Sequence, residues 1–260
     1  MRSIIVLGLM VVLSRAALPM SFDCSDNMQD VCDNMCWGAY CTHPAFGTKL
    51  EYDNYGGTGD REGSVGKRRT NSAGCTPRPN RCSPEAGKNC DEYPFASTSD
   101  ADKGGQVTKC VVSGHNSRQG NIIKNYVSAN CNKQKCSFTI GFGEPDTKGV
   151  KYCTARSDPY NKCIPDGTIW KNGKKDVRPP KSASRRSTGN DNTTTSLPGG
   201  LYLMKSGMKV AFGEDLDIGT KTKRAAPRNA TFARRALEGL EDEDDVHWDF
   251  HDDEIVARLE

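Results

Sequence analysis

The stretch Cys90-Asp91-Glu92-Tyr93-Pro94-Phe95-Ala96-Ser97-Thr98 decides how the rest of the chain is interpreted. Two adjacent carboxylates follow a cysteine directly, and a tyrosine, a proline and a phenylalanine come straight after them. A crosslinked cysteine and a stiff aromatic segment would together hold the two acids in fixed positions. We therefore predict that Asp91 and Glu92 belong to a site that needs a rigidly placed carboxylate.

The N-terminus has the pattern of a secretory signal peptide, which we assign to residues 1–17. Arg2 supplies the positive start, residues 4–13 form an apolar stretch, and Ala16-Ala17 are small residues suited to cleavage. The apolar stretch is too short to span a bilayer comfortably, and no later segment is apolar enough to span one. The sequence therefore predicts a secreted, extracellular protein that works away from a membrane.

The cysteines predict a disulfide framework and mark its extent along the chain. All twelve lie between Cys24 and Cys163, and an even number behind a signal peptide is typical of disulfide-rich secreted domains. Zinc is the alternative, because the C-x3-C motif at 32–36 and the C-x4-C motif at 131–136 have loosely ligand-like spacings. The lack of paired CxxC motifs favours disulfides, whose connectivity the spacing leaves open.

The rest of the sequence divides into a compact part and a polar extension. Only 35% of the residues are apolar, so a core built from this chain is small and depends on crosslinks. By composition the extension is expected to be disordered and exposed, and sequons at Asn192 and Asn229 predict glycosylation. The predicted units are a disulfide-rich domain at 22–165, a basic and polar linker at 166–200, and an extension at 201–260 with a short hairpin and an acidic tail.

Apolar patterns predict one helix and two strands with clear signals. Residues 25–36 have a capping serine and apolar side chains at helical spacing, so a helix is predicted there. Residues 107–112 and 136–142 have patterns typical of strands. Weaker signals predict a glycine-rich loop region at 47–80, a polar loop at 113–120 and a helix at 121–127.

Polar side chains in the middle of the chain have the chemistry of a metal-dependent hydrolase. The candidates are Asp91, Glu92, His115, Asn116, Gln119 and Asn125. Carboxylate, imidazole and amide oxygen are ligands for a hard or borderline divalent cation, and a neighbouring carboxylate can deprotonate water. Other interpretations stay open: Asn116 and Gln119 would cap the helix, His115 would be an exposed loop residue, and backbone amides would satisfy the two acids.

The order of these residues resembles one known family. The stretch at 90–98, the pair Gly104-Gly105 and the motif Asn116-Ser117-x-Gln119-Gly120 are similar to those of the NucA/NucB family of secreted deoxyribonucleases. The resemblance covers roughly residues 24–155. Further similarity, to the cysteine-rich fungal members, comes from residues 32–38, Phe142-Gly143 and Cys153.

The resemblance implies an α+β fold, a small disulfide-stapled domain whose centre is a β-hairpin followed by a helix, as in the ββα-metal nucleases. It implies Asp91 as the general base and a single divalent metal ion, Mg²⁺ or Mn²⁺, as the cofactor. The expected catalytic residues are then Asp91, Glu92, His115, Asn116 and Gln119, and the expected metal ligands are Glu92, His115, Asn116 and Asn125.

Two departures from the family pattern bear on activity. Related fungal sequences usually have a carboxylate just before the asparagine, where this chain has His115, and the acidic residue expected ahead of Gly104-Gly105 is replaced by the longer segment 99–103. The leading hypothesis is a secreted, metal-dependent endonuclease that hydrolyses DNA. The alternative is a catalytically weak or inactive relative that acts as a secreted binding or effector protein.

The charge distribution favours a nucleic acid as the partner. Phosphate contacts need lysine and arginine near the site. The basic segment 171–186 would add binding affinity that does not depend on the DNA sequence. The cations nearest to the site in sequence are Lys103, Lys109, Arg118 and Lys124. No segment has the pattern of a base-reading helix, so we expect a monomer that cleaves DNA, and RNA as a second substrate, with little sequence specificity.

Overall fold

The computed structural model describes residues 17–54, 64–76, 78–132, 134–171, 174–175, 199–227 and 248–259. The predicted signal peptide up to residue 16, most of the basic linker, and the sequons at Asn192 and Asn229 lie outside these ranges. Within these ranges, no helix is long and apolar enough to cross a membrane.

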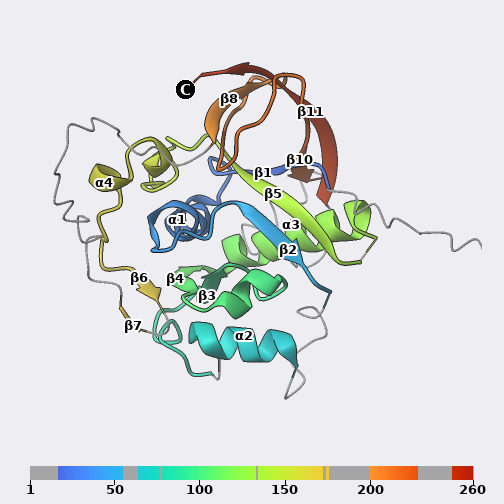
Figure 1. The fold of residues 1–260 in the computed structure, drawn as a ribbon. Helices are drawn as coiled ribbons and strands as arrows, with labels where there is room; N and C mark the ends of the chain where they lie inside the picture. The colour runs from blue at the N-terminus through green and yellow to red at the C-terminus, as the bar shows by residue number, and fades with distance from the viewer. Residues whose placement is uncertain are drawn as a thin grey trace, which may run out of the picture.

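A barrel of six strands organises the fold and forms the upper part of the molecule in Figure 1. Its strands follow the order β1 (Met20–Asp23), β10 (Lys221–Pro227), β11 (Trp248–Arg258), β8 (Gly200–Met204), β9 (Lys209–Phe212) and β5 (Cys136–Gly143). β5 pairs with β1 in turn and closes the sheet, while β2 (Lys49–Tyr52) adds to β5. The mixed helix and strand content is confirmed, but a barrel organises the fold where the sequence predicted a ββα-metal-like centre.

Apolar side chains fill the barrel and explain why it closes. Tyr202, Phe212 and Ile255 are fully buried in one cluster, each from a different strand. Gly141 pairs with Phe212 across β5 and β9, and a Cβ atom at Gly141 would lie 2.5 Å from the Phe212 ring. The absence of a side chain at Gly141 therefore lets the aromatic ring of the next strand fit inside.

A second, smaller sheet contains the acidic stretch. β3 (Lys88–Tyr93) pairs antiparallel with β4 (Val107–Val112), and β6 (Ile169–Lys171) and β7 (Lys174–Lys175) follow. β3 has a neighbour on one side only among the described strands, so its other edge is open. α3 (Ser113–Asn130) begins directly after β4, and α1 (Gln29–Cys36) packs against both strands.

The remaining helical segments lie around this sheet and the barrel. In Figure 1, α2 lies at the end of the molecule opposite the barrel, with β3 and β4 in between. These segments are η1 (Trp37–Cys41), α2 (Val65–Ala73), η2 (Ser99–Lys103), η3 (Ala155–Ser157) and α4 (Pro159–Lys162).

The predicted disulfide framework is confirmed, since all twelve cysteines form six disulfides and none remains to bind zinc. Two of them attach α1 to its surroundings, and two more attach β3 and β4 to the segment before them. The pairs are Cys24–Cys32, Cys36–Cys153, Cys41–Cys163, Cys75–Cys90, Cys82–Cys110 and Cys131–Cys136.

Two helical regions differ from the sequence prediction. Residues 113–120 were expected as a loop but form the first turns of α3, where Arg118 and Gln119 are buried. Within the predicted loop region 47–80, α2 forms because Ser64 caps its N-terminus and the buried Arg69 forms ion pairs with the buried Asp53 and the exposed Asp102. In both cases polar side chains make the buried contacts, so the apolar periodicity that reveals most helices is missing.

The C-terminal extension was predicted to be disordered apart from a short hairpin. β8 and β9 form that hairpin, but the described part of the extension also supplies β10 and β11 to the barrel. The acids of β11 face lysines of β10, with ion pairs between Lys221 and Glu254 and between Lys223 and Asp252. Ile255 is fully buried on the other side of the strand. Opposite charges across paired strands stabilise a segment that looks merely acidic when it is considered alone.

Candidate active site

A groove of about 1130 Å³ runs past the open edge of β3. One wall comes from α2 and the loop after it, and the other from α3. Four of the six predicted site residues line this groove: Asp91, Glu92, Asn116 and Gln119. The structure therefore gathers two carboxylates and two amides, from β3 and α3, around one cavity.

Asp91 is the most buried acid of the groove, with 2% of its surface exposed. Asn34 of α1 donates from Nδ2 to the Asp91 carboxylate at 2.9 Å and approaches the Asp91 carbonyl oxygen at 3.3 Å. Burial raises the pKa of Asp91 well above its usual value, and this outweighs the hydrogen bond with Asn34 and the weaker interaction with the nearby Gln119 side chain, both of which lower it. The negative charges of Glu92 and Asp30 raise the pKa further, so the proton of Asp91 is held tightly.

Glu92 is the next residue of β3, so its side chain leaves the strand on the opposite face. It is half-buried, and burial raises its pKa to about 7, although the backbone amide of Ala96 and the positive charge of Arg81 lower it. Neither Asp91 nor Glu92 forms an ion pair with a lysine or arginine of the described chain. The groove therefore contains two carboxyl groups that titrate abnormally because they are buried without a paired cation.

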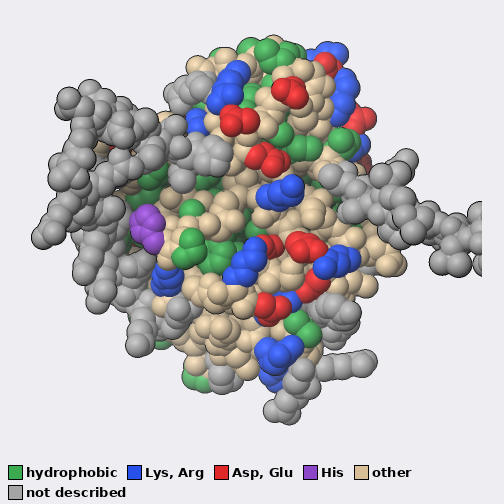
Figure 2. Space-filling view, viewed as in Figure 1, with side chains coloured by type: hydrophobic (Ala, Val, Ile, Leu, Met, Phe, Trp, Pro, Cys, Tyr) green, Lys and Arg blue, Asp and Glu red, His purple; other side chains and the backbone are tan. Residues whose placement is uncertain are grey.

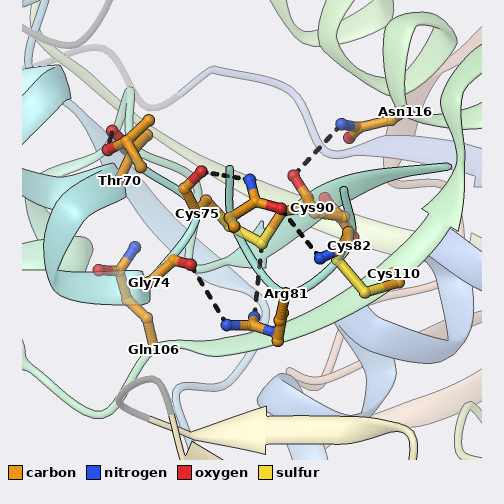
Figure 3. Close-up of a disulfide and its surroundings, with 12 residues drawn as sticks. Thr70, Gly74, Cys75, Arg81, Cys82, Cys90, Gln106, Cys110 and Asn116 are labelled. Carbon is orange, nitrogen blue, oxygen red and sulfur yellow. Dashed lines mark hydrogen bonds between the residues drawn. A yellow bond between two sulfur atoms is a disulfide. The ribbon is translucent and has the colours of Figure 1, made fainter. Parts of the chain in front are cut away.

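Disulfides and one arginine fix the strand that carries these acids, as Figure 3 shows. Cys90 is bonded to Cys75, and the Arg81 guanidinium donates to the Gly74 carbonyl oxygen at 3.4 Å and lies 3.4 Å from the Cys90 sulfur. Arg81 also stacks on the Trp170 ring at 4.9 Å. Burial lowers the pKa of Arg81 to about 10, so the guanidinium stays charged beside Glu92.

The aromatic residues after the acids form the rigid support that the sequence predicted. Tyr93 is fully buried, donates from its hydroxyl to the Gly47 carbonyl oxygen at 2.6 Å, and packs edge-on against Phe95 at 5.4 Å. A Cβ atom at Gly38 would lie 2.4 Å from the Tyr93 ring, so this position requires glycine. The Trp37-Gly38 pair of η1 thereby contributes to the placement of β3.

His115 does not reach the groove wall. Its Nδ1 atom lies 2.5 Å from the Asp30 carboxylate of α1, and Asp30 also accepts from the Val112 backbone amide at 2.6 Å. Burial alone would raise the pKa of Asp30, but the hydrogen bonds with His115 and with the Val112 amide hold it below its usual value. The histidine that replaces the expected carboxylate is therefore already engaged with a carboxylate of another helix.

Asn125 lies apart from the other predicted residues. It lines a separate pocket of about 420 Å³ with Lys223 of β10 and with Trp248, Asp249 and Phe250 of β11. Gly120 and Lys124, five residues and one residue earlier on α3, line the groove instead. Successive residues of a helix point about 100° apart, so Asn125 faces the barrel and not the acids.

The basic residues that were expected near the site differ in whether they form ion pairs or line the groove. Lys103, Lys109 and Arg118 form ion pairs with Asp100, Asp33 and Asp26. Lys124 lies on the groove wall, together with two cations that the sequence did not indicate, Lys67 of α2 and Arg78 of the loop after it. On the face shown in Figure 2, by contrast, acidic and basic side chains are interspersed.

The donor chemistry of the groove fits a hard divalent cation. No group of three His, Cys, Asp or Glu side chains in the described chain is arranged to hold a metal ion, but Mg²⁺ keeps several waters and needs only one or two protein carboxylates. Two buried polar atoms next to Asp91 have no hydrogen bond of ordinary geometry within the described chain: Asn34 Oδ1 and Gln119 Nε2. An oxygen acceptor and an amide donor beside an unpaired carboxylate suit a hydrated cation and a phosphate oxygen.

Sequence reasoning missed three residues of this site. Asn34 and Asp30 lie one turn apart on α1 and contact Asp91 and His115, while Arg81 lies behind Glu92. The polar residues at positions 30, 33 and 34 interrupt the apolar face of a helix that is otherwise buried, and this is the signal that could have revealed them.

Comparison with known proteins gives a family match for the segment that contains the groove. Residues 35–140 match the family model described as deoxyribonuclease NucA/NucB, and this segment contains every residue of the groove wall described above. Neither the curated proteins nor the solved structures give a match. The segment that runs from the end of α1 into β5 is therefore similar to the NucA/NucB deoxyribonuclease family.

Proposed function

We propose that the protein is a secreted, metal-dependent endonuclease that hydrolyses DNA phosphodiester bonds with little sequence specificity. One observation carries the proposal: the two carboxylates of the family segment lie in a groove whose walls also carry Asn116, Gln119 and three cations. The six disulfides support secretion, since such frameworks form in oxidising compartments.

In this proposal Asp91 is the general base, which takes the proton from the attacking water. Its burial and its hydrogen bond to Asn34 hold the accepting oxygen in one place. Gln119 lies beside the same carboxyl group and orients the water or a phosphate oxygen. The raised pKa of Asp91 means that the carboxyl group must lose its proton before it can act, so activity should increase with pH until Asp91 is ionised.

Glu92 and Asn116 are the residues that would hold a divalent ion at the groove, and His115 and Asn125 are not part of this ligand set. A bound Mg²⁺ or Mn²⁺ supplies positive charge that favours ionised carboxylates and stabilises charge on the phosphate. Arg81 keeps Glu92 closer to its charged form through its own fixed charge. Asn116 is held in place by its hydrogen bond to the Cys90 carbonyl oxygen at 3.4 Å.

Binding of DNA is assigned to the cations of the groove walls. Lys67 and Arg78 lie on one wall and Lys124 on the other, so a phosphate backbone between them would meet positive charge from both sides. Contacts of this kind position the backbone without reading bases, which is the reason for the proposed low specificity. RNA as a second substrate and a monomeric state remain predictions.

Plasmid cleavage tests the proposal directly. We expect wild-type protein to nick and linearise supercoiled DNA with Mg²⁺ or Mn²⁺ and to stop when a chelator is added. Asp91→Asn should lower the rate by about 10²–10⁴-fold, because the proton acceptor is lost while the shape is kept. Metal-independent cleavage, or an Asp91→Asn rate equal to wild type, would contradict the proposal. DNA binding without any cleavage would support the alternative of an inactive binding protein.

A further inference from the structure

Helix α1 presents polar side chains to the site from outside the family segment, which begins at residue 35. Asp33 and Asn34 are both fully buried. Asp33 anchors the helix, because its carboxylate pairs with Lys109 of β4 and accepts from the Lys151 backbone amide at 2.7 Å. Disulfides at Cys32 and Cys36 fix α1 on the same turns. The helix therefore has little freedom to move relative to β3.

Asn34 uses this fixed position to contact Asp91 twice. Its Nδ2 donates to the carboxylate at 2.9 Å and lies 3.3 Å from the carbonyl oxygen of the same residue. The carboxylate oxygen that Asn34 binds is therefore defined relative to the backbone of β3. No other side chain of the described residues has a hydrogen bond of ordinary geometry to Asp91, since Gln119 Nε2 lacks one.

A purely structural role explains Asn34 poorly. Its Oδ1 atom is buried without a partner in the described part of the chain, and such an unpaired polar atom costs about 1–3 kcal/mol. A leucine of similar size would avoid this cost in an interior that contains Val31 and Met35. Asn34 therefore lowers the stability of the fold but orients the Asp91 carboxylate, and this combination is typical of functional sites.

We propose that Asn34 is a positioning residue of the nuclease site, which holds the Asp91 carboxylate in the orientation needed to accept a proton. The inference rests on the proposed function, because it assigns the role of Asn34 through Asp91. It also extends the site to α1, so the family segment 35–140 would be incomplete as a catalytic unit without the preceding turn.

A double-mutant cycle tests the inference. Asn34→Leu should lower kcat for plasmid cleavage by about tenfold or more and leave KM within about twofold, because the contact is made to the base and not to DNA. In the Asp91→Asn background the same substitution should leave the residual rate unchanged, since the effect acts through Asp91. A merely structural residue would lower the rate equally in both backgrounds, and that result would overturn the proposal.

The matched control is Gln106→Leu. Gln106 is also buried, also donates one hydrogen bond to a backbone carbonyl, that of Pro94 at 3.0 Å, and also has an unpaired oxygen within the described chain. We expect Gln106→Leu to keep the wild-type kcat at equal melting temperature. If Asn34→Leu does not fold, Asn34→Ser replaces it in the same cycle. Full activity of the Asn34 variant beside an inactive Asp91→Asn would refute this inference alone, whereas an active Asp91→Asn would refute the proposed function.

Discussion

The elements around the groove are tied together by disulfides, whereas strands β8 to β11 contain no cysteine and are held by hydrogen bonds and packing alone. The groove elements bury two carboxyl groups that have no paired cation within the described chain. The C-terminal strands instead pair two acids, Asp252 and Glu254, with lysines and bury Ile255 and Phe212. The crosslinks thus lie where the side-chain chemistry costs stability.

This difference has a simple physical reason. A disulfide lowers the entropy of the unfolded chain, and so it stabilises the fold whatever side chains it surrounds. Cys75–Cys90 and Cys82–Cys110 flank β3 and β4, so they offset the cost of burying Asp91 between them. The comparison predicts that changes near the groove affect cleavage first, and that changes in the C-terminal strands affect stability alone.

Removal of the Cys75–Cys90 bond should have the largest effect. The double variant Cys75→Ser/Cys90→Ser opens a loop with a sequence separation of 15, which should cost about 3 kcal/mol of unfolding free energy. It should also lower kcat by about 10–100-fold, because β3 loses the anchor next to Asp91. The measurements are thermal unfolding and plasmid cleavage below the unfolding range.

The control for that prediction is Cys131→Ser/Cys136→Ser, which removes a bond of separation 5 between the end of α3 and β5. It should cost less stability, because the loop that it closes is shorter, and it should leave kcat unchanged. Equal loss of kcat in the two double variants would show that the disulfides stabilise the fold in general and do not position the groove residues.

The C-terminal strands should show the opposite response. Ile255→Ala removes a fully buried side chain from β11 and should lower the unfolding free energy by about 2–4 kcal/mol, with kcat unchanged at a temperature where the variant is folded. Val256→Ala, at the next and exposed position, should change stability by less than about 0.5 kcal/mol. A drop in kcat for folded Ile255→Ala would mean that the barrel and the groove are coupled.

The pH dependence of stability should reveal the cost of burying Glu92. The pKa of Glu92 is raised from 4.5 to about 7 in the folded protein, so the fold binds this proton more tightly than the unfolded chain does. The contribution is therefore fully present below pH 4.5 and is lost as the pH rises towards 7, by about 1–3 kcal/mol. Glu92→Gln should flatten the slope of melting temperature against pH in this range, whereas Glu85→Gln, on an exposed pair with Lys88, should keep it. An unchanged slope in Glu92→Gln would contradict the assignment.

The smallest effect is expected at the groove wall. Lys124→Gln should weaken DNA binding by a few fold at low salt and reduce the slope of log K against log salt by about one unit. Lys221→Gln, on the outside of the barrel and paired with Glu254, should leave the slope at its wild-type value. Fluorescence anisotropy with labelled DNA in the presence of a chelator measures both without cleavage. Equal slopes in all three proteins would remove Lys124 from the DNA-binding surface.

The predictions that succeeded rest on local patterns. The strand at 107–112 has the bounds expected from its alternation, and the helix that ends at Cys36 follows its apolar spacing. Asp91 and Glu92 of the motif at 90–98 line the same groove as Asn116 and Gln119, because a short strand and the first turns of a helix carry them. Features set within about ten residues of chain were therefore predictable.

The predictions that failed depend on partners far away in the chain. β11 has a strongly polar sequence, and only its pairing with β10 and β8 makes it a strand. His115 was predicted at the site because it precedes Asn116 in the chain. In the structure it contacts Asp30 of α1 and does not line the groove. Asn34 belongs to no recognisable motif, and its contact with Asp91 joins two elements that lie 57 residues apart in the chain. Long-range contacts of polar groups leave little trace in a single sequence.

The closure of the barrel has a consequence for the order in which the chain can fold. β1 pairs with β10, with Met20 opposite Lys223, so this strand has a neighbour that is synthesised about 200 residues later. Until then Met20 and Phe22, both buried in the finished protein, lack part of their cover. Contacts of such sequence separation form slowly and expose apolar surface to aggregation. Folding of this protein should therefore benefit from chaperones that protect β1 until β10 has been made.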